Sequence, residues 1–205
     1  MDLPPAVVSG SWWHQGPVGR PLLSCPAPAR GPGRYHKADG PGAWYASSTM
    51  SASWCELFRH FVGNGIDPFE VRRRAGRCAV DRLAVLDLSD AIVREALGVT
   101  GEDLVGDDYE ICQRLAQGAR VAGFDGVMAP SAGLAGQRTL AVFAGVLDEG
   151  RVVVETERVQ VPPINLVKLL PRVRSMPAAA AAFEAYAGDL TRLSYESVRR
   201  LYRRR

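Results

Sequence analysis

Three side chains of different chemistry stand eleven residues apart in the N-terminal part of the chain: Arg34, Tyr45 and Glu56. Glu56 lies beside an apolar stripe at helical spacing that includes Trp54, so we expect its carboxylate to be partly desolvated. A desolvated carboxylate needs a hydrogen-bonding partner or a chemical role. Spacing alone leaves two interpretations open: an ion pair at the surface with Arg59 or Arg34, or an acidic group of a binding site.

Several motifs of phosphate binding, nucleophilic catalysis and metal binding are absent from the sequence. The chain has no Gly-x-x-x-x-Gly-Lys-Ser/Thr loop, no Gly-x-Ser-x-Gly elbow and no Gly-x-Gly-x-x-Gly turn between a strand and a helix. Its four cysteines form no Cys-x-x-Cys pair, and its three histidines form no His-x-x-x-His pair. We therefore expect no metal site and no disulfide framework.

The length of 205 residues, with 47% hydrophobic and 23% charged residues, is typical of one globular domain. We expect a single domain over residues 1–205, with a core at about 11–160 and a helical C-terminal extension at 161–205. No apolar run approaches the roughly 18 residues that a membrane-spanning helix needs. The first residues lack the basic and apolar regions of a signal peptide, which predicts a cytoplasmic location.

The C-terminal extension ends in a basic tail. Residues 192–205 contain six arginines and one glutamate, whereas the whole chain carries a formal charge of only +3. Such a tail is compatible with a nucleic-acid-binding module, and this is the alternative function from a different class. Because aromatic residues are scarce among these arginines, we expect direct binding of nucleic acid to be the weaker hypothesis.

The pattern of apolar residues predicts alternating strands and helices without the regular order of a Rossmann fold, so we expect an α+β protein. Its mixed, partly antiparallel sheet is expected to be flanked by helices. A serine or threonine at 47–49 and Ser89 are the expected caps of two helices, and 148–150 is the expected turn of a hairpin. The predicted strands are 11–14, 43–46, 78–80, 83–88, 127–129, 139–144 and 152–159, and the predicted helices end at 63, 97, 122 and 201.

Two blocks of the sequence resemble the RES-domain family, which is named after an arginine, a glutamate and a serine. In GRYHKADGPGAWYASSTMSASWCE, the residues Arg34, Tyr45 and Glu56 fall on the family's arginine, strand tyrosine and helix glutamate. In GDDYEICQRLAQGARVAGFDGVMAPSAG, Ser131 falls on the serine. The resemblance covers residues 11–145, and it depends on two blocks in the right order.

The resemblance implies both a fold and an activity. RES proteins are similar in fold to ADP-ribosyltransferases, and they are toxins of toxin-antitoxin modules whose partner is an Xre-type antitoxin protein. They consume NAD as substrate by breaking the bond between nicotinamide and ribose. The implied function is an NAD phosphorylase or NADase, with inorganic phosphate or water as the acceptor. The alternative within the family is a mono-ADP-ribosyltransferase that modifies a protein.

The resemblance also implies roles for the charged residues. Breaking the nicotinamide bond creates an oxocarbenium-like centre, which a carboxylate beside the ribose stabilises, and Glu56 suits this role. The planar guanidinium of Arg34 matches phosphate oxygens, so it is the expected clamp on the pyrophosphate or on an attacking phosphate. Lys37 is expected to assist as a point charge.

Five further residues complete the site that the resemblance implies. Tyr45 is expected to stack on nicotinamide or to bind the ribose, and Tyr35 is a second candidate for this contact. Ser131 is expected either to donate to a phosphate oxygen or to cap a turn. His14 replaces part of a pair that lines the family's site, and it is expected to face NAD or to lie at the surface. His36 stands where the family carries an amide.

Overall fold

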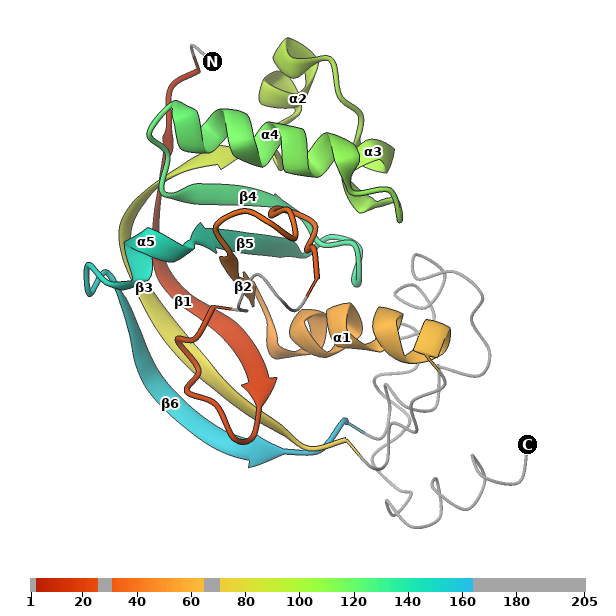
Figure 1. Ribbon diagram of the computed structural model, residues 1–205, viewed down its shortest axis with the longest axis vertical. Coiled ribbons are helices and arrows are strands. Elements are labelled where there is room, and N and C mark those ends of the chain that lie inside the picture. The colour runs from red at the N-terminus through yellow and green to blue at the C-terminus, as the bar shows by residue number, and fades with distance from the viewer. Residues whose placement is uncertain (1–2, 26–30, 65–70, 164–205) are drawn as a thin grey trace.

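Six strands and five helices make up the part of the chain that the computed structural model describes, namely residues 3–25, 31–64 and 71–163 (Figure 1). The extension at 164–205, with its expected final helix and basic tail, lies outside these residues. The strands are β1 (Ala6–Pro17), β2 (Ala43–Ser47), β3 (Arg73–Asp87), β4 (Gly126–Pro130), β5 (Arg138–Phe143) and β6 (Val152–Gln160). The helices are α1 (Met50–Asn64), α2 (Ala91–Leu97), α3 (Gly101–Val105), α4 (Glu110–Val121) and α5 (Ala144–Leu147).

The sheet closes on itself like a barrel. Its order is β1-β2-β5-β4-β3-β6, and an additional pairing joins β3 back to β1. Within the described residues, β3 and β4 run parallel, whereas the other paired strands run antiparallel. The expectation of an α+β protein with a mixed, partly antiparallel sheet is therefore confirmed.

Strand β3 holds the barrel together because it pairs with β1, β4 and β6. The sequence predicted two short strands here, but the chain continues through Arg82, which adopts a left-handed φ of 49°. Gly76 lies where β3 pairs with β6. A Cβ at this position would come within 2.1 Å of the carbonyl oxygen of Thr156, so only glycine allows this approach.

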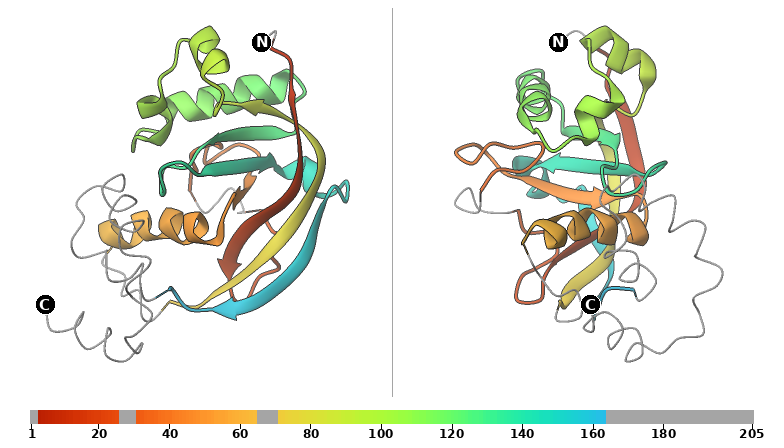
Figure 2. Two further views of the ribbon diagram at one scale, coloured as in Figure 1. Left: turned by 180° about the vertical axis from the view of Figure 1, so that it is seen from behind. Right: turned by 90° about the vertical axis from the view of Figure 1, so that its right-hand side faces the viewer.

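Helices cover two sides of the short strands β4 and β5. In each view of Figures 1 and 2, α4 and α1 lie on opposite sides of these strands. The buried face of α4 consists of Cys112, Leu115, Ala116 and Ala119. None of the helices among the described residues is long and apolar enough to cross a membrane.

Two local predictions are wrong. Asp90, and not Ser89, caps α2, because its carboxylate accepts the Ile92 N–H at 2.8 Å while Ser89 donates to Asp87. The expected hairpin at 148–150 does not form either. The short helix α5 follows β5, and β6 pairs with β3 instead of β5. The cap predicted at 47–49 is confirmed at Thr49, whose hydroxyl accepts the Ala52 N–H at 3.2 Å.

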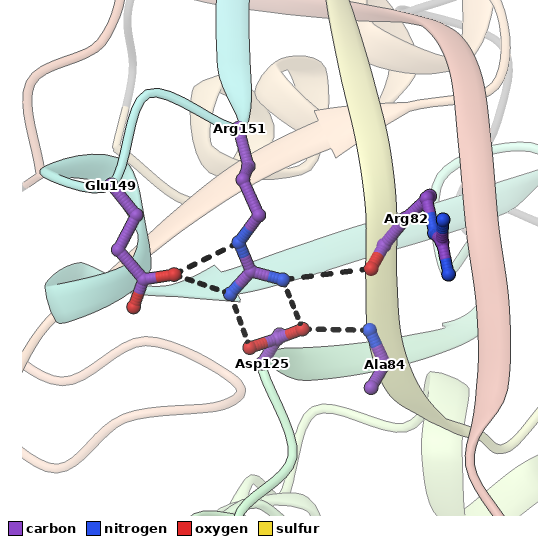
Figure 3. A network of polar contacts seen from close by, with 5 residues as sticks. All are labelled: Arg82, Ala84, Asp125, Glu149 and Arg151. Atoms are coloured by element: carbon purple, nitrogen blue, oxygen red, sulfur yellow. Dashed lines mark hydrogen bonds and ion pairs between the residues drawn. The ribbon is translucent and has the colours of Figure 1, made fainter.

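A network of charged residues joins β3, the start of β4 and the start of β6 (Figure 3). The Arg151 guanidinium donates to both oxygens of Asp125, at 2.7 and 2.6 Å. The same carboxylate accepts the Ala84 N–H of β3 at 2.7 Å, and Arg151 also donates to Glu149 at 2.8 Å. The network thus links the residues that precede β4 and β6 to β3.

We expect Asp125→Ala to lower the free energy of unfolding by about 2 kcal/mol, because it removes two hydrogen bonds of Arg151 and leaves the Ala84 N–H without its acceptor. Hydrogen bonding to Arg151 lowers the pKa of Asp125, so this stabilisation is present above its ordinary pKa of 3.8 and is lost as the pH falls through the folded value. Urea titrations at pH 7 and at acidic pH measure both effects.

Glu149→Ala is the matched control, since this carboxylate binds the same arginine but is 53% exposed. We expect it to cost less than about 1 kcal/mol. Equal losses for the two variants at pH 7 would contradict the assignment of Asp125 as the centre of the network.

Candidate active site

A cavity of about 470 Å³ lies between the loop at 31–36, the end of β1 and helix α1. A volume of this size is within the range of small-molecule sites. Its lining includes six of the residues singled out from the sequence, namely His14, Arg34, Tyr35, His36, Tyr45 and Glu56. Among the described residues, no group of three or more His, Cys, Asp or Glu side chains is placed to hold a metal ion.

One oxygen of the Glu56 carboxylate is held by three donors, two from the segment between β4 and β5 and one from β5. Its Oε1 accepts the Ser131 hydroxyl at 2.6 Å, the Gly133 N–H at 3.0 Å and the Thr139 hydroxyl at 3.2 Å. No donor reaches Oε2 from the side chains that the structure describes, which leave out those of residues 59–64. Within this part of the chain the carboxylate is fixed at one oxygen, and the other is available to a ligand in the cavity.

Gly133 permits this arrangement. A Cβ at this position would come within 2.5 Å of the backbone nitrogen of Glu56 and 2.7 Å of the carbonyl carbon of Cys55. Both are backbone atoms of α1, which cannot move aside without displacing the helix. The absence of a side chain thus brings the donors of the β4–β5 segment onto Glu56.

Ser131 is buried and does not line the cavity. Its hydroxyl donates to Glu56 and accepts the N–H groups of Gly133 and Leu134, at 3.2 and 3.1 Å. Because a hydroxyl has one proton to give, none remains for a phosphate oxygen. The geometry favours the turn-capping interpretation of this serine and adds to it the orientation of Glu56.

Arg34 is held in place through one end of its guanidinium. Nη1 donates to the carbonyl oxygens of Leu104 and Gly106, at 2.9 and 2.7 Å, and the guanidinium carbon lies 4.5 Å from the ring centroid of Tyr109. Nη2 is buried and has no hydrogen-bond partner in the part of the chain that the structure describes. A buried N–H without an acceptor is costly, which makes Arg34 a strong candidate for a ligand contact.

The hydroxyl of Tyr45 holds the loop that carries Arg34. It accepts the Tyr35 N–H at 2.9 Å and lies 2.9 Å from Nδ1 of His36, to which it has one proton to donate. Burial raises the pKa of Tyr45, so the hydroxyl keeps that proton. A Cβ on Gly33 would come within 2.7 Å of the same hydroxyl, which explains why glycine precedes Arg34.

His36 is buried, and it acts as a structural link where the family carries an amide. Its Nδ1 lies 2.9 Å from the Tyr45 hydroxyl, and burial lowers its pKa. A neutral imidazole offers one donor and one acceptor, as a carboxamide does. The ring thus bridges the loop and β2.

The two remaining candidates, Tyr35 and Lys37, occupy different environments. Tyr35 is 1% exposed, its ring lies 6.4 Å from that of Tyr45, and its hydroxyl has no hydrogen-bond partner. Lys37 is exposed and is not among the residues that line the cavity. The structure thus brings Tyr35 to the site and leaves Lys37 outside it.

His14 faces the cavity from β1. Its Nδ1 hydrogen-bonds the carbonyl oxygen of Tyr45, and its ring centroid lies 4.9 Å from a ring of Trp44. Burial lowers the pKa of His14 to about 4. The ring is therefore neutral at pH 7, with its proton on Nδ1 and a free lone pair on Nε2.

Several residues that line the cavity or hold its loop were not singled out from the sequence. Tyr109 stacks on Arg34, and Gln113 donates to the carbonyl oxygens of Gly33 and His36. Arg73 begins β3, a part of the strand that the apolar pattern did not reach. The only available signal was the second family block, which contains both Tyr109 and Gln113.

Two known proteins are similar to this chain in sequence. The chain is 49% identical over 199 residues to a protein of Mycobacterium tuberculosis named "Probable NAD(+) phosphorylase Rv3189", covering 96% of this chain and 94% of that protein. It is 43% identical over 54 residues to "NAD(+) phosphorylase MbcT" of Mycobacterium bovis, covering 26% of this chain and 29% of that protein.

A solved structure is similar over most of the fold. The crystal structure of the Mycobacterium tuberculosis MbcT-MbcA toxin-antitoxin complex matches with a TM-score of 0.69 and 24% identity, covering 83% of this chain and 92% of the matched chain. The sequence model of the RES domain matches residues 9–163. These residues include most of β1, the other five strands and the residues that line the cavity, and the chain belongs to the RES domain family.

Proposed function

We propose that this chain is an NAD phosphorylase that acts as the toxin of a toxin-antitoxin pair. The observation that carries the proposal is the Glu56 carboxylate, which is fixed through one oxygen in a cavity that also contains Arg34. The 49% identical relative is named for the same reaction. The substrate is NAD, and inorganic phosphate is the proposed acceptor.

Glu56 acts on the ribose that carries nicotinamide. As the bond between nicotinamide and ribose breaks, its electron pair goes to the pyridinium nitrogen, and nicotinamide leaves as a neutral molecule. Positive charge then develops on the sugar, where Oε2 of Glu56 stabilises it. Because the leaving group needs no proton, the site needs no general acid on that side.

Arg34 suits the pyrophosphate of NAD. Its Nη1 is already bound to two carbonyl oxygens, so the guanidinium is oriented before the substrate arrives. Its buried Nη2 would gain in a phosphate oxygen the acceptor that it lacks. The neutral His14 offers Nε2 as an acceptor for a ribose hydroxyl, and the Tyr45 ring supplies an aromatic face.

The proposal extends to fold relationship, location and partner. The mixed barrel-like sheet with a strand tyrosine and a helix glutamate fits an ADP-ribosyltransferase-like fold. A cytoplasmic location fits an enzyme that consumes NAD. The structural relative was solved as a toxin-antitoxin complex, which supports an antitoxin partner for this chain, and we propose that it is of the Xre type. Co-purification with the product of an adjacent gene tests the partner.

We expect Glu56→Gln to lower nicotinamide release from NAD by about 100-fold or more, because it removes the charge that stabilises the transition state and keeps the shape of the side chain. The measurement is chromatography of nicotinamide after incubation of the purified protein with NAD and phosphate. Labelled NAD run in parallel identifies the acceptor, since label on protein would indicate ADP-ribosylation instead.

Glu149→Gln is the control, because it removes a carboxylate that is not among the residues lining the cavity. We expect it to leave the rate within twofold of the unchanged protein. Release by the Glu56 variant at a rate close to that of the control would refute the assigned role, and no release by the unchanged protein would refute the activity itself.

We expect the free energy of unfolding to decrease as the pH is lowered, because of His14. Its folded pKa of about 4 lies below the unfolded value of 6.5, so the unfolded state binds the proton first as the pH decreases. At pH 4.5 this linkage costs about 2 kcal/mol relative to neutral pH. His14→Gln, which does not titrate, should lack this part of the loss. Urea titrations of both proteins between pH 7.5 and 4.5 measure the difference, and parallel curves would show that His14 does not titrate as described.

A further inference from the structure

The cavity contains a second cationic group to which the proposed reaction has given no role. Arg73 is the first residue of β3 and lines the cavity. Its Nε donates to Oε1 of Gln15 at 3.2 Å, and Nε2 of Gln15 donates to the carbonyl oxygen of Ser53 at 2.7 Å. These contacts connect the guanidinium to β1 and, through Gln15, to α1. Neither contact uses the two terminal nitrogens of Arg73.

Arg73 differs from Arg74 and Arg77 of the same strand in having no acidic partner among the described residues. Arg74 pairs with Glu157 at 2.8 Å, and Arg77 pairs with Glu155 at 2.7 Å. Burial lowers the pKa of the Arg73 guanidinium, which nevertheless stays charged at neutral pH. A partly buried cation without a carboxylate partner favours the binding of an anion.

Arg34 and Arg73, two of the three arginines that line the cavity, are held by different parts of its wall. Arg34 is bound to the end of α3 and the residue after it, whereas Arg73 begins β3. Figures 1 and 2 show α1, the helix that carries Glu56, between α3 and the start of β3. The two cations therefore come from separate elements, and each can serve a different anion.

We propose that Arg73 binds the inorganic phosphate that attacks NAD, while Arg34 binds the pyrophosphate of the dinucleotide. This inference rests on the proposed function. An oxygen of hydrogen phosphate forms a bond to the ribose carbon, and the bond from that carbon to nicotinamide breaks with its electron pair going to the pyridinium nitrogen. The products are neutral nicotinamide and ADP-ribose carrying the phosphate, so charge and atoms balance without a further reactant.

The charge of Glu56 explains why the acceptor needs its own cation. A phosphate dianion that approaches the ribose also approaches this carboxylate, and the two repel each other. Arg73 offsets that repulsion at the acceptor, whereas a water molecule as acceptor would need no such compensation. Arg73 therefore sets the preference for phosphate over water.

The test is the kinetics of Arg73→Gln. Nicotinamide release is measured against phosphate at saturating NAD and against NAD at saturating phosphate, and the products are separated by chromatography. We expect KM for phosphate to rise tenfold or more and KM for NAD to stay within twofold. At low phosphate, the product should shift from the phosphorylated sugar to ADP-ribose. Arg73→Lys should restore part of the phosphate affinity.

Arg74→Gln is the matched control, since it removes the same charge from the next position of β3, where the side chain pairs with Glu157 and does not line the cavity. It should change neither KM. An unchanged KM for phosphate in Arg73→Gln, or an equal rise in both KM values, would overturn the proposal. Failure of the unchanged protein to release nicotinamide would instead overturn the proposed function.

Gln15→Met provides a second test that leaves the arginine in place and serves if Arg73→Gln does not fold. It removes the acceptor that orients Nε. As Gln15 acts by positioning, we expect a severalfold rise in KM for phosphate with an unchanged kcat at saturating phosphate. An unchanged KM for phosphate in this variant would argue against the Arg73 subsite as well.

Discussion

Oxygen Oε1 of Glu56 accepts three hydrogen bonds, and this requires the segment between β4 and β5 to lie directly against α1. Gly133 makes the approach possible, because any side chain there would strike the helix backbone. The strands that flank the segment are central members of the closed sheet, so the position of the carboxylate follows from the barrel. The chemistry of the site depends on this contact, since it fixes one oxygen and leaves the other to the substrate.

The loop that carries Arg34 is held by a second set of contacts that use side chains from elsewhere in the fold. Tyr45 on β2 binds it through the Tyr35 N–H and the His36 ring, and Gln113 on α4 binds two of its carbonyl oxygens. Tyr45 therefore links the arginine loop to the sheet with its hydroxyl while its ring lines the cavity. This double use explains why a phenol suits this position better than a purely apolar ring.

The sequence was informative where the signal was local or where a family pattern covered it. Arg34, Tyr45 and Glu56 were expected to share a site, and all three line one cavity. Closure of the barrel was beyond local reasoning, because β1 pairs with β3 across more than fifty residues and no turn marks that pairing. The hairpin at 148–150 failed for a related reason, since the ion pair of Arg151 with Asp125 directs β6 away from β5. The family pattern predicted Ser131 as a residue of the site, but only the structure shows that its proton goes to Glu56.

The charges around the cavity are unequal in a way that suits an anionic dinucleotide. Among the described residues that line it, Arg20, Arg34 and Arg73 are cationic, whereas Glu56 is the single carboxylate. Burial lowers the pKa values of the two lining histidines, so neither adds charge at neutral pH. The site therefore attracts phosphates overall and concentrates its one negative charge on α1. A reaction that develops positive charge on a sugar between phosphate groups needs this distribution: cations to bind the phosphates, and one anion reserved for the atom that becomes positive.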